Sequence, residues 1–394
     1  MTIYLDYQAT TPLAPEARRA MEPWLDKFGN PHSPHRLGRE AKAAVEVARE
    51  AISGLLRSSR AKSRGVGAEL ARRPSTTLGT SADDDGQLLF TSGATEAANL
   101  AIKGAAWAAP SQRRQIVTIA TEHACVLDTV LWLGRHGFEA VVLPVEADGL
   151  VDLDRLRAAV GDRTALVAAM LVNNEIGVIQ PIAEIARIAR DAGALFFCDA
   201  VQGFGRLPIP DADLIAVSAH KIHGPKGIGA LWVRKGVVIE PLMHGGGQED
   251  DIRSGTLSPM LCAGFGAAAA VAEARVEDDR AHVAALWAMA HERLPDWSVN
   301  GSAEHRYRGN LNVRLDGLDA GRLIADVRGV SFSAGSACAS GSGRPSHVLK
   351  ALGLSDAEAR SSIRLGFGRY TTEEELHQAL DLIIEAAARQ RVFA

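Results

Sequence analysis

The sequence is poor in cysteine and lacks a long apolar run, and each shortage excludes a class of protein. Four cysteines, Cys125, Cys198, Cys262 and Cys338, are scattered among 394 residues without a CxxC pair. This spacing argues against a disulfide framework and a tetrahedral zinc site, and it fits a reducing cytoplasm. No run of about 18 apolar residues occurs, and the N-terminus MTIYLDYQATTPL lacks the regions of an export signal, so we expect no membrane span.

An excess of charge of either sign is also missing. The formal net charge is -4, which gives no general attraction to nucleic acid or to anionic lipid. Hydrophobic residues make up 47% of the chain, enough for a sizeable core. At 394 residues the chain exceeds the length that one core usually serves, so we expect a large domain and a smaller one.

Short apolar runs alternate with helical patterns between residue 88 and about residue 235. LLFTSG precedes TEAANLAIKGAAW, for example, and ALVAAMLVNNE precedes IAEIARIARDAG. Continuous apolar strands separated by helices predict an α/β fold with a mainly parallel sheet covered on both faces. In such sheets ligands bind beyond the carboxyl ends of the strands.

The pattern changes after Ser258-Pro259, where an Ala-rich helix is predicted as far as about residue 294. Short strands and helices follow, the last helix starting at Thr372. We therefore expect a large domain over 13–257 and a smaller α+β domain formed by 1–12 and 258–394. Residues 57–87 lack periodicity and run from basic to acidic, which predicts an exposed loop or a poorly ordered insertion.

The most specific local signal is SAHKIHGPKG, in which Lys221 follows an apolar strand and is flanked by His220, His223 and Lys226. A lysine at a strand end beside cationic groups can have a pKa low enough for it to form a Schiff base. By itself the segment could equally be a surface loop, since short motifs match by chance.

Asp199 strengthens this interpretation. The apolar run ALFFC ends in this carboxylate, at the end of what should be an adjacent strand. A carboxylate there can keep a pyridine nitrogen protonated and make the ring an electron sink, with Gln202 facing the same ring. The alternative is an aspartate that only caps a turn.

Three further strand ends carry candidate binding groups. LLFTSGATEAANL is a strand, a glycine turn and a helix, so the N–H groups around Ala94 and Thr95 suit a phosphate, or the helix is simply capped. His123, after QIVTIATE, could stack on a cofactor ring and shuttle protons, although a lone histidine is more often structural. Arg364 in SSIRLGF could bind a substrate carboxylate with its guanidinium fork, or form a surface ion pair.

Cys338 differs from the other cysteines because it lies in the small-residue segment SAGSACASGSG, which should be mobile and accessible. Exposure and thiolate formation control the reactivity of cysteine. Cys198 and Cys262 lie in apolar segments and are expected to pack in the core, whereas the setting of Cys125 is indeterminate.

Several segments occur in order between residue 3 and about residue 376: YLDYQATTP, FGNPHSPHRLG, TSGATEAANLAIKG, TEHACV, VNNEIGVIQP, CDAVQ, SAHKIHGPKGIGALWVR, RSGTLSP, GSACAS and SSIRLGFGRYTT. Together they resemble the cysteine desulfurases, NifS-like and IscS-like, of the class V aminotransferase family. The resemblance implies an aspartate aminotransferase-like fold (fold type I of the pyridoxal-phosphate enzymes) and a homodimer. It also implies conversion of L-cysteine to L-alanine, with the sulfur held as a persulfide on the enzyme.

The resemblance further implies a role for each matching residue. Lys221 would carry pyridoxal 5'-phosphate as a Schiff base, Asp199 would pair with the pyridine nitrogen and Gln202 would approach the ring oxygen. Ala94, Thr95, Ser218 and His220 would contact the phosphate, and Thr256 would reach the cofactor of the partner subunit. His123 would stack on the ring and shuttle protons, Asn174 and Arg364 would hold the substrate carboxylate, and Cys338 would attack the substrate sulfur.

The same resemblance implies partners. The segment around Cys338 would hand the persulfide to an iron-sulfur scaffold or a sulfur-carrier protein, for cluster assembly or thiolation, and Cys338 could become a transient cluster ligand there. No resident metal is expected. Two departures from the family pattern are the insertion at 57–87 and Gln8, which replaces Ser or Asn.

Three other functions fit parts of the sequence. A selenocysteine lyase or another class V aminotransferase would share the cofactor residues but not depend on Cys338. A nicotinamide dehydrogenase is raised by GFGAAA at 264–269, which fits GxGxxA but follows Ser-Pro inside a helical pattern. A sulfur-carrier or regulatory paralogue without catalysis is disfavoured because every proposed cofactor position is filled.

Overall fold

The computed structural model describes residues 2–63, 85–209, 211–334 and 345–392. Its largest feature is a seven-stranded sheet in the order β2-β8-β7-β6-β5-β3-β4. The strands are β2 (Gly86–Thr91), β3 (Gln115–Ile119), β4 (Glu139–Leu143), β5 (Thr164–Met170), β6 (Leu195–Asp199), β7 (Leu214–Ser218) and β8 (Gly229–Arg234). Strand β8 runs antiparallel to β2 and β7, and the other neighbours pair in parallel. The predicted mainly parallel sheet is confirmed.

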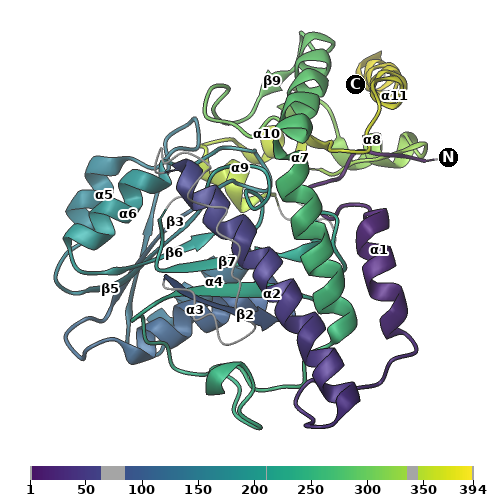
Figure 1. Ribbon diagram of the computed structural model, residues 1–394. Helices are drawn as coiled ribbons and strands as arrows, with labels where there is room; N and C mark the ends of the chain where they lie inside the picture. Colours follow the sequence, from purple (N-terminus) through teal and green to yellow (C-terminus); the bar gives the residue numbers. More distant parts are fainter. Residues whose placement is uncertain (1, 64–84, 210, 335–344, 393–394) are drawn as a thin grey trace.

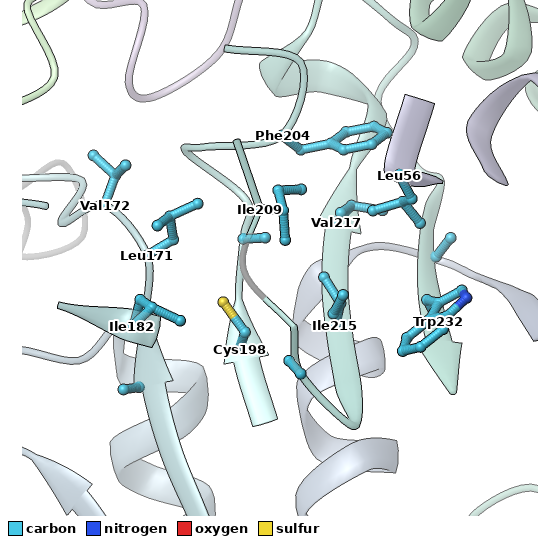
Figure 2. Close-up of a cluster of buried hydrophobic side chains, with 14 of the residues drawn as sticks. Leu56, Leu171, Val172, Ile182, Cys198, Phe204, Ile209, Ile215, Val217 and Trp232 are labelled. Atoms are coloured by element: carbon cyan, nitrogen blue, oxygen red, sulfur yellow. The ribbon is translucent and has the colours of Figure 1, made fainter. Parts of the chain in front are cut away.

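Both faces of this sheet are buried, as the continuous apolar strands require. Successive side chains of a strand point to opposite faces, so Ile215 and Val217 of β7 join one apolar cluster while Leu214 and Ala216 join another. The first cluster includes side chains of α2 (Arg36–Ser63), α6 (Ile182–Asp191) and α7 (Pro259–Glu292). The second includes those of α3 (Ala94–Ala108) and α4 (Ala124–Gly134). Figure 2 shows Val217 beside Leu56 of α2, and Ile215 lower on the same strand between Cys198 and Trp232.

Two smaller sheets, one of three strands and one of two, involve the C-terminal part of the described chain. Strand β10 (Asn310–Arg314) pairs antiparallel with β12 (Ser362–Gly366) and β9 (Ser298–Val299), and β1 (Ile3–Tyr4) pairs in parallel with β11 (Val330–Ser331). These strands share an apolar cluster with α8 (Ala320–Asp326) and α11 (Glu373–Val392). The remaining short elements are α1 (Pro15–Met21), η1 (Glu22–Trp24), α5 (Leu153–Ala159), η2 (Ala219–Lys221), η3 (Glu249–Asp251), α9 (His347–Ala351) and α10 (Asp356–Arg360).

The apolar cluster of the small sheets supports a smaller C-terminal unit, but the cluster of the large sheet also contains Val348 and Leu349. The proposed domains, 13–257 and 1–12 with 258–394, stay a prediction. Helix α7 runs through both parts, since Phe265 packs in the cluster of the large sheet and Leu286 in that of the small one. Figure 1 shows α7 extending from the side of α2 up to the region of α8 and α11. Among the described residues α7 is also the one helix long and apolar enough to cross a membrane, but this packing makes it a core helix.

The expected loop over 57–87 is wrong at its ends. Residues 57–63 continue α2, and β2 begins at Gly86. The basic side chains there belong to the helix: Arg60 is buried, pairs with Asp85 and Asp211, and stacks on the Trp232 ring at 4.2 Å. The polar composition concealed the end of the helix, where Arg60 can be buried because its charge is paired. The middle of the predicted insertion, 64–84, lies outside the described residues.

The dehydrogenase alternative is contradicted by the position of GFGAAA inside α7. A Cβ atom on Gly266 would lie 2.6 Å from the Ala48 Cα atom of α2. The glycine therefore lets two helices approach closely, and it does not form a nucleotide-binding turn after a strand.

Candidate active site

Three of the predicted residues lie at the carboxyl ends of neighbouring parallel strands. Asp199 is the last residue of β6, Ser218 is the last residue of β7, and Lys221 ends η2 immediately after β7. His123 is the N-cap of α4, which follows β3. Because these strand ends lie at one edge of the sheet, residues 98 positions apart in sequence, His123 and Lys221, interact electrostatically with Asp199.

The N-terminus of α3 reaches the same edge through β8. Gly229 pairs with both Thr91 of β2 and Ser218 of β7, which places the turn after β2 next to the end of β7. A Cβ atom on Gly229 would lie 2.7 Å from the Gly93 carbonyl carbon, so only glycine permits this approach.

Helix α3 begins without a side-chain cap, so the N–H groups of its first turn, at Ala94 and Thr95, can bind an anion. Glu96, in the same turn, would repel an anion if its charge were uncompensated. Its carboxylate instead accepts the Ser92 N–H at 2.7 Å and pairs with Arg253 at 2.7 Å. These contacts compensate the negative charge of Glu96, so that the positive end of the helix dipole can still attract an anion.

Lys221 is held by main-chain oxygens of the N-terminal segment. Its Nζ atom donates to the carbonyls of Gln8 at 2.6 Å and Ala9 at 2.7 Å. Burial, followed by the positive charges of Arg206 and Arg364, lowers the pKa of Lys221 to about 8. A substantial fraction of the side chain is therefore a neutral amine at slightly alkaline pH, the form that attacks an aldehyde.

The cations that lower this pKa are not the ones that the sequence placed beside Lys221. Burial lowers the pKa of both His220 and His223 to about 4, so neither histidine contributes a positive charge near neutral pH. The positive charges that lower the pKa of Lys221 are those of Arg206 and Arg364, which are distant from it in sequence.

Asp199 and His123 form the electrostatic centre of the site. Burial raises the pKa of Asp199, and the charges of His123 and Lys221 oppose this rise. Its Oδ1 atom accepts the Val201 N–H at 3.0 Å. Burial lowers the pKa of His123, whose Nδ1 atom accepts the Cys125 N–H at 3.2 Å as the cap of α4.

Gln202 lies in the turn after β6 and is buried. Its amide donates to the Gln8 carbonyl at 2.9 Å and accepts from Arg206 at 2.9 Å. Gln8, the departure noted in the sequence, therefore supplies a main-chain acceptor to both Gln202 and Lys221.

The two residues predicted to hold a carboxylate lie together. Arg364, in β12, is 1% exposed; it donates to the Asn174 carbonyl at 2.9 Å and pairs with Asp6 at 2.6 Å. The predicted surface ion pair is thus a buried one. Among the described residues, Arg364 Nε is a buried donor without a hydrogen-bond partner.

The remaining predicted residues lie beside this network, as His220 does, or apart from it, or outside the described residues. His220 Nδ1 lies 3.2 Å from Thr10 Oγ1. Thr256 is exposed on the loop after η3, and no hydrogen bond in the described part of the chain links it to Lys221 or Asp199. Cys338 lies outside the described residues.

The sequence did not identify Asp6, Gln8 or Arg206 as part of the site. The segment YLDYQATTP entered only as a family resemblance, and no periodic signal marks its approach to Lys221. A single basic residue four positions after Gln202 was the one available indication of Arg206.

A family model described as aminotransferase class-V matches residues 78–379. This chain belongs to that family. Members of the class-V aminotransferase family use pyridoxal 5'-phosphate. Cysteine desulfurase IscS of Rickettsia rickettsii (strain Iowa) is 42% identical over 406 residues, covering 100% of this chain and 93% of that relative. IscS of Rickettsia felis is 43% identical, covering 97% of this chain and 90% of the relative.

Solved structures of the same kind are similar throughout. A NifS-like protein superposes with a TM-score of 0.85 at 32% identity, covering 99% of this chain and 100% of that one. A structure described as SspA in complex with cysteine gives a TM-score of 0.77 at 34% identity, covering 94% and 100%. The expected fold and family are confirmed.

The side chains present fit the family's cofactor. An amine with a lowered pKa suits the aldehyde, a buried carboxylate suits the pyridine nitrogen, and an uncapped helix N-terminus suits the phosphate. No group of three or more metal-ligating side chains occurs among the described residues.

Proposed function

We propose that this protein is a pyridoxal-phosphate-dependent cysteine desulfurase that converts L-cysteine to L-alanine and takes up the sulfur as a persulfide on Cys338. The observation that carries the proposal is the convergence of Lys221, Asp199 and the open N-terminus of α3 on one edge of the sheet. Relatives named cysteine desulfurase, similar over the full chain, support the choice of substrate.

Lys221, Asp199, His123 and Gln202 would hold the cofactor, with Ala94, Thr95, Ser218 and His220 at its phosphate and Thr256 at that of the partner subunit. When bound, the cofactor supplies an electron sink for the electron pair released at the substrate Cα. Asp199 would maintain that sink because its negative charge keeps the ring nitrogen protonated. Lys221, whose lowered pKa of about 8 leaves a substantial fraction as the neutral amine at pH 8, would exchange places with the incoming amine of the substrate.

Arg364 and Asn174 would bind and orient the substrate carboxylate. The guanidinium already has one buried N–H without a protein partner in the described chain, which gives an entering carboxylate a donor to bind. His123 would move a proton to or from the substrate carbon.

Cys338 would attack the substrate sulfur as a thiolate. The new S–S bond forms as the Cβ–S bond breaks, and the electron pair left on the carbon skeleton takes up a proton to give alanine. The persulfide would then pass to an iron-sulfur scaffold or a sulfur-carrier protein in the cytoplasm, where Cys338 could act as a transient cluster ligand.

A homodimer is part of this proposal. Leu25 and Phe28 are 71% and 86% exposed in the connection between α1 and α2, and a second copy would cover such apolar side chains. The loop carrying Thr256 is tied to α3 by the Arg253–Glu96 ion pair, so it would approach the partner from beside the phosphate site.

The experiment uses the purified holoenzyme. We expect visible absorbance from lysine-bound cofactor, and formation of alanine and sulfide when L-cysteine and a thiol reductant are added. Cys338→Ala should keep the absorbance and lose sulfide formation, whereas the buried Cys262→Ala should keep both. Absorbance without Cys338-dependent turnover would overturn the desulfurase and favour a selenocysteine lyase or an aminotransferase. No absorbance at all would favour a non-catalytic paralogue.

A further inference from the structure

Arg206 connects two cofactor-site residues that come from different strands. It lies half-buried in the turn that follows β6. One guanidinium nitrogen donates to the side-chain oxygen of Gln202 at 2.9 Å, and the other donates to the main-chain carbonyl of Lys221. The guanidinium also rests over the buried Tyr307 ring, 5.2 Å from its centre.

This contact fixes the orientation of the Gln202 amide. Arginine has donors only, so the atom of Gln202 that faces it must be the oxygen. The amide nitrogen then faces the Gln8 carbonyl at 2.9 Å, as observed. One N–H of that nitrogen remains to approach an oxygen on the cofactor ring.

The charge of Arg206 acts on Lys221 as well. After burial, it is the largest influence that lowers the pKa of Lys221. Arg364 acts in the same direction, and Asp6 and Asp199 oppose it. His123 and His220 also face Lys221, and burial lowers the pKa of both.

We propose that Arg206 is a positioning residue that prepares Lys221 and Gln202 together for the cofactor. The proposal rests on the cofactor site of the proposed function. It adds that one side chain, acting through its contacts with Gln202 and Lys221, controls both the proton on the Lys221 nitrogen and the direction of the Gln202 amide.

The test is a pH titration of the holoenzyme's visible absorbance, which reports the proton on the nitrogen of Lys221 when it carries the cofactor. Arg206→Met removes the charge and the hydrogen bonds but keeps an apolar contact for Tyr307. Because a positive charge disfavours protonation nearby, its loss should move the midpoint about one pH unit higher. Arg187→Met on the surface of α6, which removes an exposed arginine paired with Asp191, should leave the midpoint unchanged.

Arg206→Lys separates charge from geometry. It retains the positive charge, so the midpoint should stay close to that of the unaltered protein. It loses the planar fork that bonds Gln202 and Lys221 at once, so cofactor release on dilution should be several-fold faster. This variant also carries the test if Arg206→Met does not fold, as judged by circular dichroism.

The outcomes separate this proposal from the function. If the unaltered protein shows no absorbance, the cofactor site itself is refuted. Suppose instead that the unaltered protein and Arg187→Met show the absorbance and the desulfurase activity. If both Arg206 variants then have the same midpoint and the same rate of cofactor release as the unaltered protein, Arg206 is only structural. In that case the inference about Arg206 is refuted and the proposed function stands.

Discussion

The Nδ1 atom of His123 lies 3.1 Å from the sulfur of Cys125 and accepts the main-chain N–H of the same residue at 3.2 Å. An amide N–H can only donate, so Nδ1 has its lone pair directed at α4 and the proton of the neutral ring sits on Nε2. Protonating Nδ1 would remove the cap of α4. Burial also favours the neutral ring, because it lowers the pKa of His123, and the resting imidazole is therefore neutral.

Cys125→Ala should raise the pKa of His123. The thiol can donate to Nδ1 and thereby stabilise the neutral ring, and alanine cannot. Cys125→Ser retains a donor at the same position and should give a smaller change. The measurement is an NMR titration of the ring nitrogens of His123. Equal pKa values in all three proteins would show that the main-chain cap alone sets the protonation state.

Asp199→Asn should retain the overall fold and slow turnover by about 10²–10³-fold, the range for the loss of one preorganised electrostatic contact. The amide has the shape of the carboxylate but no charge to hold a proton on the ring nitrogen. Alanine formation from L-cysteine measures the effect, and visible absorbance verifies that the cofactor is bound.

Asp199→Glu is the matched control, since it keeps the charge and displaces it by one methylene group. Its activity should lie between those of the unaltered protein and Asp199→Asn. If Asp199→Asn were as active as the unaltered protein, the negative charge at the end of β6 would have no part in the reaction.

The sequence was informative where a candidate residue is marked by its immediate neighbours in the chain. Lys221 and Asp199 were predicted as site residues because each follows an apolar run, and the structure places both at the carboxyl ends of neighbouring parallel strands. Strand β7 was predictable since all five of its residues are apolar or small and are buried on both faces. The sequence of β7 alone could not show that its side chains alternate between two apolar clusters, because those clusters form only when the whole sheet is assembled.

What the sequence could not reveal depends on distant contacts. The Gln8 carbonyl meets Lys221 across 213 positions of chain, and Asp6 meets Arg364 across 358. The end of α2 was misread for a similar reason. Arg60 looks like a loop residue until Asp211 and Trp232, which fold against it, compensate its charge.

His223 should make stability depend on pH on the acid side. Its folded-state pKa of about 4 is below the ordinary value of 6.5, so protonation favours the unfolded chain. The contribution is fully present above about pH 6.5 and is lost as the pH falls towards 4.

His223→Asn should weaken this dependence. Asparagine does not titrate, and it tolerates the left-handed backbone at this position, where φ is 68°. We expect the loss of unfolding free energy between pH 7 and pH 5, from urea titrations, to be smaller than in the unaltered protein. His136→Asn, at an exposed position, is the control; if it has the same effect, His223 is not responsible.

Phe204 should be important for stability because it joins the turn of the active site to the core. Its ring is 0% exposed and meets Phe265 of α7 edge to face, with ring centres 6.3 Å apart. Figure 2 shows it above Val217 and close to Leu56. Phe204→Ala should lower the free energy of unfolding by about 3–5 kcal/mol, because a close-packed core does not refill a ring-sized cavity.

A double-mutant cycle with Phe265→Ala distinguishes the ring pair from general burial. If the two rings interact directly, the double variant should lose about 0.5–1.5 kcal/mol less than the sum of the single variants, because the second substitution has no ring contact left to remove. Chemical denaturation of the four proteins gives the four free energies. Strict additivity would mean that each ring is stabilised by its other neighbours, and that α7 is held against the turn after β6 by burial alone.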